Sequence, residues 1–506
     1  MKNRFEQRGT GRHFNWEESS VYIVTRASAF AVFLEVGFES MGNELKKKYG
    51  LITAIAMVVG IVIGSGVFFK ATKVLLATGG NLPLGILAWA IGGLIMIVCA
   101  YTFSILANKY EKVNGLIAYA EAALGPKYGY MMGWFLTTIF YPCMCVPIAW
   151  LGAKYACSLF GLPGDSAAAL TLTAVFLIFS FAINALAPIL AGKIQVSTTI
   201  IKLVPLLLMA IVGTIVGLFN GMTVENMTTV VTNVDTGSGL FAAVVATAFA
   251  YEGWIIATSI NAELKDAKKN LPRALIFGTA LVAVVYILYY IGLAGSVSSQ
   301  TLMENGDNGV ILAFETLFSK SFGTILIVFI IISCLGALNG MMLGCSRGMY
   351  SIAARKMGPA PEVFGEVDDK TGTPVNSSII ALLTCSLWLL YFYASQLADP
   401  CWFGNYWFDI TELPIVTVYA AYIPIFLMII KREKELSVFK RYFVPVVAIG
   451  ACCFMVFAGV AAHGITVVWY LIVFVMIMLA GLFFLLRNQK RDSLVQRSDC
   501  PEEKES

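Results

Sequence analysis

The chain has 506 residues, of which 58% are hydrophobic and 13% charged, with a net charge of +4 and a mean hydropathy of +0.79. Soluble domains carry roughly a quarter of charged residues, so this chain lacks the polar surface to coat several water-soluble cores. Its two histidines argue against histidine-rich zinc sites, and its 11 scattered cysteines contain no CxxC pair. The composition predicts a polytopic, all-helical membrane protein, with no cofactor, metal site or nucleic-acid partner expected.

A helix needs about 20 apolar residues to cross a bilayer. Twelve such spans can be drawn in chain order: 51–78, 82–107, 127–156, 167–190, 196–219, 239–262, 273–297, 322–352, 376–396, 410–430, 442–463 and 466–487. With the N-terminus inside, 30 of the 35 Lys and Arg residues fall on the cytoplasmic side. Both termini are therefore expected in the cytoplasm.

The spans imply a division of the chain into five parts. We expect a disordered cytoplasmic extension before the spans, two repeats of five helices, a further helix pair and a cytoplasmic tail. The corresponding ranges are 1–44, 45–219, 238–430, 442–487 and 488–506. Met41 is a natural start just before the first span, so residues 1–40 are either a dispensable extension or a mobile tail.

The first span contains a cluster of small residues, Gly60, Gly64, Ser65 and Gly66. Glycine is costly inside a helix, so the cluster indicates a place where the helix unwinds. Exposed backbone groups at membrane depth are tolerated only where they line a cavity or meet a ligand. Close helix packing through small residues explains the cluster equally well.

The sixth span is interrupted in the same way, at Tyr251, Glu252, Gly253 and Trp254. Glu252 is the only acid in that apolar run, and an acid there is expensive unless it is hydrated or paired. It marks either a functional site or a buried structural pair. Because the two interruptions each open a set of five spans, they predict an inverted-repeat transporter. A helix N-terminus for an anion and freed carbonyls for a cation together suit an α-amino acid.

Polar residues in other spans are candidates for coupling and gating. Lys202 in the fifth span either snorkels to the surface or bridges helices where a sodium-coupled relative would hold Na⁺. Ser333 and Asn339 in the eighth span either partner this lysine or line the cavity. Tyr286 in the seventh span is either a cavity donor or an interfacial aromatic. Cys143 and Cys145 in the third span are most simply explained by helix packing.

Four motifs in order make a resemblance specific: IGSGVFF at 63–69, AYEGW at 250–254, EL…KNLPRAL at 263–275 and SCLGALNG…SRGMYSIAARKMGPAP at 333–361. The chain resembles the amino acid–polyamine–organocation superfamily, in particular its L-type branch and bacterial serine/threonine exchanger-like members. The resemblance runs from about Leu45 to Arg487. It implies a LeuT-like fold of two inverted five-helix repeats, with helices 1 and 6 unwound at midspan, plus two helices.

The resemblance also implies which residues bind substrate. The GSG backbone, with Gly64, Ser65 and Gly66, would hold the substrate carboxylate. Carbonyls at Val62 and at the second break, with its residues Phe249, Glu252 and Gly253, would take the amino group. Lys202 would replace a sodium ion beside Ser333, and Tyr286 matches the family's cavity tyrosine.

Two departures from the family qualify the expected function. Animal L-type chains carry a cysteine after span 3 that joins a heavy chain, whereas GLPGDS at 161–166 has none, so no disulfide-linked heavy chain is expected. At the second break, Glu252 replaces the Asp or small residue that is more usual in the family.

We expect a sodium-independent exchanger of small neutral amino acids in a bacterial plasma membrane, and no enzyme. The alternatives are a cationic amino acid or polyamine transporter, a proton-coupled symporter, or an amino acid sensor that does not transport.

Overall fold

The computed structural model describes residues 49–64, 66–107, 109, 115–164 and 166–498, without the side chains of 259–262, 307 and 489–498. The predicted extension 1–44 and residue Ser65 therefore lie outside the described residues. Within the described part of the chain, eleven helices are long and apolar enough to cross a membrane, or twelve if the bent pair at the start is one span. The predicted number of spans was twelve. The described residues also contain an isolated parallel β-bridge between Tyr49 and Leu264.

The first five spans are built from helices interrupted by short π-helical turns. Their bounds are α2 Leu51–Val62, α3 Gly66–Ala77, α4 Leu82–Ala107, α5 Gly115–Leu124, α6 Pro126–Phe135, η2 Leu136–Phe140, α7 Tyr141–Leu159, α8 Ala167–Leu186, α9 Pro188–Leu208, η3 Met209–Gly213 and α10 Thr214–Phe219. The fifth span begins at Pro188 rather than at the predicted 196. Lys193 and Gln195 gave this segment a polar character, but Gln195 is buried and hydrogen-bonded inside the bundle.

The next five spans and their connectors follow the short α11 Met222–Thr228. They comprise α12 Thr236–Tyr251, η4 Trp254–Glu263, α13 Ala267–Ala294, α14 Ser299–Asn305, η5 Gly306–Asn308, α15 Gly309–Leu317, α16 Lys320–Ser346, α17 Gly348–Ala353, α18 Pro361–Phe364, α19 Val375–Phe392, η6 Tyr393–Leu397 and α20 Leu413–Arg432. The chain closes with η7 Phe439–Phe443, α21 Val444–His463 and α22 Thr466–Ser498.

Burial separates the central helices from those that face outward. In the span formed by α6 and α7, 89% of the apolar window is buried, whereas in α22 only 11% is buried. Apolar side chains remain exposed on outer helices, such as Leu387 on α19 and Phe483 on α22. Such a surface is stable only in an apolar solvent, which agrees with a membrane protein.

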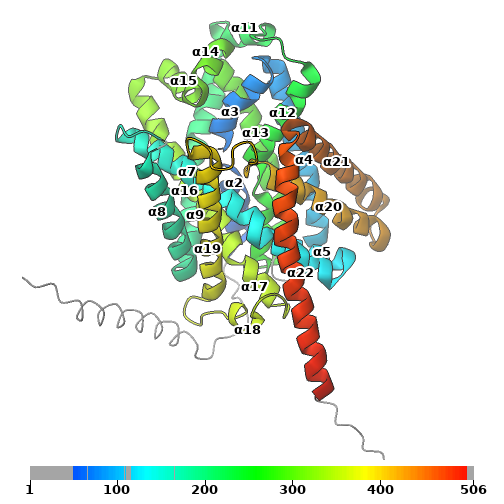
Figure 1. Ribbon diagram of the computed structural model, residues 1–506. Coiled ribbons are helices and arrows are strands. Elements are labelled where there is room, and N and C mark those ends of the chain that lie inside the picture. Colours follow the sequence, from blue (N-terminus) through cyan, green and yellow to red (C-terminus); the bar gives the residue numbers. More distant parts are fainter. Residues whose placement is uncertain (1–48, 65, 108, 110–114, 165, 499–506) are drawn as a thin grey trace, which may run out of the picture. The chain divides into compact units, whose positions relative to one another are not determined.

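The connectors gather at the two ends of the bundle. In Figure 1, α11, α14 and α15 lie together at one end, and α17 and α18 lie at the other. Several spans begin at side-chain caps: Ser166 accepts a hydrogen bond from the N–H of Ala169, and Asp235 accepts one from Ser238. These caps fix where α8 and α12 begin.

Candidate functional site

The first span is broken near its middle. Helix α2 ends at Val62, Ile63 is extended with ψ 91°, and α3 begins at Gly66 at an angle of 40° to α2. The N–H of Gly64 turns back to the carbonyl oxygen of Val62 at 2.8 Å. The backbone between the two helices is thus released from the regular helical pattern, as predicted, although Ser65 itself is outside the described residues.

The sixth span is broken at the predicted position. Helix α12 ends at Tyr251, and Glu252 is extended with φ −80° and ψ 162°. Gly253 has φ +105°, a conformation that side-chain-bearing residues rarely adopt. The chain then continues as the 3₁₀ helix η4 rather than as an α-helix.

The two breaks lie against each other. A Cβ atom on Gly66 would stand 2.9 Å from the Cα of Ala250, next to the second break. A Cβ on Gly253 would stand 2.6 Å from Cγ2 of Ile61, next to the first. Both glycines are therefore required for the close approach of the two unwound segments.

A cluster of aromatic side chains packs against these breaks. The hydroxyl of Tyr286 on α13 donates to the carbonyl oxygen of Val62 at 2.9 Å, and that of Tyr251 donates to the carbonyl oxygen of Trp89 at 2.9 Å. The Trp89 ring makes edge-on contacts with both tyrosine rings. Tyr286 is fully buried, so it is no interfacial aromatic; it contacts the backbone at the first break.

Lys202 also contacts the first break. Its ammonium donates to the carbonyl oxygen of Gly60, in the last turn of α2, at 2.5 Å, and its side chain is 0% exposed. The lysine therefore does not snorkel to the surface. The hydroxyl of Ser333 on α16 lies 3.5 Å from the carbonyl oxygen of Ile63. Helices α9 and α16 thus both reach the backbone around the end of α2.

Asn339 lies apart from these contacts. Its side-chain amide donates to the carbonyl oxygen of Ala191 and to Oε1 of Gln195, both at 3.1 Å. Its own Oδ1 accepts from Asn184 on α8 at 2.9 Å. The structure places Asn339 in an amide cluster that joins α8, α9 and α16, and not beside Lys202.

Glu252 is the least satisfied polar residue at the breaks. Its side chain is 2% exposed, and neither carboxyl oxygen has a hydrogen-bond partner among the described residues. The ionisable groups near the carboxyl group include the thiol of Cys99 on α4 and the phenols of Tyr419 and Tyr422 on α20. None of these three groups is a cation.

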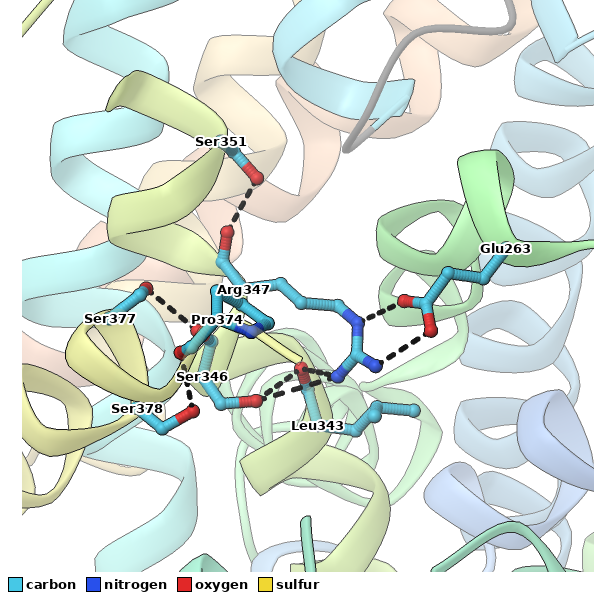
Figure 2. A network of polar contacts seen from close by, with 8 residues as sticks. All are labelled: Glu263, Leu343, Ser346, Arg347, Ser351, Pro374, Ser377 and Ser378. Carbon is cyan, nitrogen blue, oxygen red and sulfur yellow. Dashed lines mark hydrogen bonds and ion pairs between the residues drawn. The ribbon is translucent and has the colours of Figure 1, made fainter. Parts of the chain in front are cut away.

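A buried ion pair closes the end of the bundle where α2 begins. Figure 2 shows the guanidinium of Arg347 clamping the carboxylate of Glu263 through Nε and Nη2, the latter at 3.0 Å. Both side chains are fully buried. The backbone of Tyr49 pairs with this segment, because its N–H donates to the carbonyl oxygen of Glu263 at 3.1 Å. Burial raises the pKa of Tyr49 to about 12, so its phenol stays neutral beside the ion pair.

The Glu263–Arg347 pair is absent from the residues predicted for the site. The available signal was that Glu263 directly follows the sixth predicted span and that Arg347 lies inside the eighth. A charged side chain inside or next to a membrane span is costly unless it has a partner of opposite charge. The pair ties the end of η4 to the end of α16, so it holds the segment after the second break in place.

A second ionic network lies on the other side of the breaks. The ammonium of Lys70 on α3 contacts Oε1 of Glu412 at 2.5 Å, and His463 contacts Oε2 of the same carboxylate at 2.9 Å. The Lys70 ammonium also lies 5.1 Å from the centre of the Phe249 ring. Phe249, a predicted site residue, is thereby held between the second break and this network.

The sequence is similar to those of known membrane transporters. The model of a family described as amino acid permease matches residues 49–483. The serine/threonine exchanger SteT of Bacillus subtilis (strain 168) is 28% identical over 420 residues, or 82% of this chain and 91% of the relative. The large neutral amino acids transporter small subunit 2 of Oryctolagus cuniculus is 29% identical, covering 74% and 70%. The b(0,+)-type amino acid transporter 1 of Mus musculus is 26% identical, covering 87% and 88%.

A solved structure agrees on the fold. Mhp1, a nucleobase-cation-symport-1 family transporter in a closed conformation, superposes with a TM-score of 0.53. The alignment covers 85% of this chain and 94% of Mhp1 at 14% identity. This likeness concerns the fold alone, and it confirms the predicted fold class.

Proposed function

The chain belongs to the amino acid permease family, and we propose that it is a sodium-independent exchanger of small neutral L-amino acids. The family and the fold are those of membrane transporters and not of enzymes. The observation that carries the proposal is the contact between the two helix breaks, made possible by Gly66 and Gly253. Transport would proceed by alternating access around this point.

The backbone at the breaks suits the two charged ends of an α-amino acid. The N-terminus of α3, which begins at Gly66, suits the carboxylate, and the family resemblance assigns that group to the backbone of Gly64, Ser65 and Gly66. The N–H of Gly64 donates to the carbonyl oxygen of Val62 in this structure, so substrate would have to displace that bond. The carbonyl groups of Val62, Phe249 and Glu252 suit the ammonium. The Val62 carbonyl accepts the Tyr286 hydroxyl in this structure, so substrate would have to compete with or displace that bond.

Sodium independence rests on Lys202. Its ammonium bonds to the Gly60 carbonyl, where it would supply the positive charge that a sodium ion would otherwise bring to the end of α2, and the hydroxyl of Ser333 lies by the carbonyl of Ile63 in the same segment. Exchange of small neutral substrates is supported by the similarity to a serine/threonine exchanger and to a large neutral amino acid transporter.

Orientation and membrane are inferred from different observations. The distribution of Lys and Arg favours both termini in the cytoplasm, and a plasma membrane fits the family of the chain. A bacterial membrane fits the similarity to a bacterial exchanger. Cys157, near the end of α7, is buried, and the loop after it has no cysteine, so we expect no disulfide-linked heavy chain.

Counterflow in proteoliposomes tests the exchange activity. Purified protein would be reconstituted without sodium, and radiolabelled serine uptake compared between empty vesicles and vesicles loaded with unlabelled amino acids. We expect uptake only into loaded vesicles. Equal uptake into empty vesicles would contradict exchange, and no uptake with any of the twenty amino acids would contradict amino acid transport.

A second candidate function is favoured by Glu252. Among the described residues no side chain hydrogen-bonds to its two carboxyl oxygens, so a cationic substrate could supply a partner. Under this alternative the chain would carry cationic amino acids or polyamines.

The alternative predicts that lysine, arginine or putrescine competes with serine for uptake. It also predicts that Glu252→Gln removes this competition but leaves serine uptake unchanged. Glu304→Gln, at a hydrogen-bonded position on the surface helix α14, is the matched control. If no cation competes with serine in the unmodified protein, the alternative fails.

A further inference from the structure

Three cysteines that are far apart in the sequence meet inside the bundle. Cys145 lies on α7, Cys345 on α16 and Cys385 on α19. Their three sulfur atoms all lie within 4.8 Å of one another, and all three side chains are completely buried. We refer to Cys145, Cys345 and Cys385 as the trithiol cluster.

Burial of a cysteine says little by itself, because a free cysteine packs as a small hydrophobe. The trithiol cluster differs in that three helices each bring one sulfur to the same point. Cys99 and Cys452, by comparison, bring two sulfurs together, 3.9 Å apart. Bonds to sulfur of about 2.3 Å place three sulfurs about 4 Å apart around a planar centre and about 3.5 Å apart around a pyramidal one. The sulfurs therefore need to approach one another by at most about 1.3 Å to surround one atom.

The surroundings select the charge of that atom. In the part of the chain that the structure describes, the ionisable groups near the three thiols are one another and Cys143, and none of them is a cation. Three thiolates around a divalent ion would leave a net negative charge in an apolar interior, which is costly without a partner. Three thiolates around a trivalent centre are neutral.

We propose that the trithiol cluster is a binding site for trivalent arsenic. Arsenous acid enters as a neutral molecule, and its three hydroxyl groups leave as water. In the balanced reaction, As(OH)₃ and three thiols give As(SR)₃ and three molecules of water. Three As–S bonds form as three As–O and three S–H bonds break, with no change in oxidation state or net charge. The product joins α7, α16 and α19 covalently.

The test uses the full-length protein in detergent, reduced and then freed of reductant. Arsenous acid is titrated while near-ultraviolet absorption of As–S bonds, intact mass and melting temperature are followed. We expect one arsenic atom per chain and an upward shift of the melting temperature. Cys145→Ala, Cys345→Ala and Cys385→Ala should each weaken binding by about tenfold or more, a loss of the order expected when one of three bonds is removed.

Cys157→Ala is the matched control, because Cys157 is also a buried cysteine on α7 but lies outside the trithiol cluster. It should bind arsenic like the unmodified protein. Melting curves without arsenic identify any variant that fails to fold, and Cys→Ser at the same position then replaces it. The proposal is overturned if the unmodified protein binds no arsenic, if any trithiol-cluster variant retains full affinity, or if zinc binds more tightly than arsenic.

Discussion

The ammonium of Lys202 donates a hydrogen bond to the carbonyl oxygen of Gly60, and this bond joins α9 to the last turn of α2 before the break. The side chain that makes it is completely buried. A Cβ on Gly60 would stand 2.1 Å from Oγ1 of Thr199, so α9 also packs directly on this turn. The position of the first break is therefore coupled to the fifth span.

Replacement of this lysine separates a role in transport from a role in folding. Lys202→Ala leaves the Gly60 carbonyl without its partner, at a cost of about 1–3 kcal/mol for a buried acceptor. We expect the protein to fold with a lowered melting temperature and to lose most of its sodium-free counterflow. Lys193→Ala, which removes an exposed lysine from the same helix, should leave both unchanged. Loss of folded protein in Lys202→Ala would instead assign the lysine to stability.

The approach of the two breaks depends on Gly66. In Gly66→Ala the new methyl group meets the backbone of Ala250, which cannot move aside like a flexible side chain. We expect counterflow to fall by at least about tenfold, because displacement of positioning groups by a fraction of an ångström to 1 Å is costly for function. The control is Gly450→Ala on α21, where an added Cβ has open space. Equal counterflow in the two variants would show that the close approach is not needed.

The Glu263–Arg347 pair should dominate the stability of the end where α2 begins. Removing one member of a buried pair strands the other charge and costs about 3–5 kcal/mol. Arg347→Ala and Glu263→Gln are therefore each expected to lower the melting temperature strongly. Arg355→Ala breaks a less buried ion pair, with Glu121, and should have a smaller effect. Thermal unfolding in detergent measures all three, and equal shifts would argue against a special role for the buried pair.

A double variant tests the network at Glu412. Glu412→Gln alone leaves the Lys70 ammonium, which is 1% exposed, without its carboxylate. Lys70→Met in the same chain removes the stranded charge. Because the stranded charge is the main cost, the double variant should melt at a higher temperature than Glu412→Gln alone. A double variant that melts at a still lower temperature would mean that Lys70 stabilises the protein mainly through other contacts, such as that with the Phe249 ring.

The interrupted helices were predictable from sequence because their cause is local. Glycine clusters and a lone acid in an apolar run mark the breaks after Val62 and at Glu252, and the structure has breaks at both. The direction of Lys202 toward the first break also agrees with the expectation that it bridges helices.

Which side chains pair between different helices could not be predicted from the sequence alone. Asn339 was expected to partner Lys202 or to line the cavity. Its side chain bonds to Asn184 on α8 and Gln195 on α9 rather than to Lys202, and the three residues line a small cavity. The Glu263–Arg347 pair joins residues 84 positions apart and depends on how η4 meets α16. Such contacts follow from the helix faces that meet in the fold, which apolar periodicity along one span does not specify.

Binding of radiolabelled serine to the purified protein tests the central claim most directly. The protein would be held in detergent with choline replacing sodium, and sodium would then be added back in steps. The account predicts saturable serine binding without sodium, competition by other small neutral amino acids, and no gain in affinity as sodium rises. Absence of saturable binding to any neutral amino acid, or binding that appears only with sodium, would contradict it.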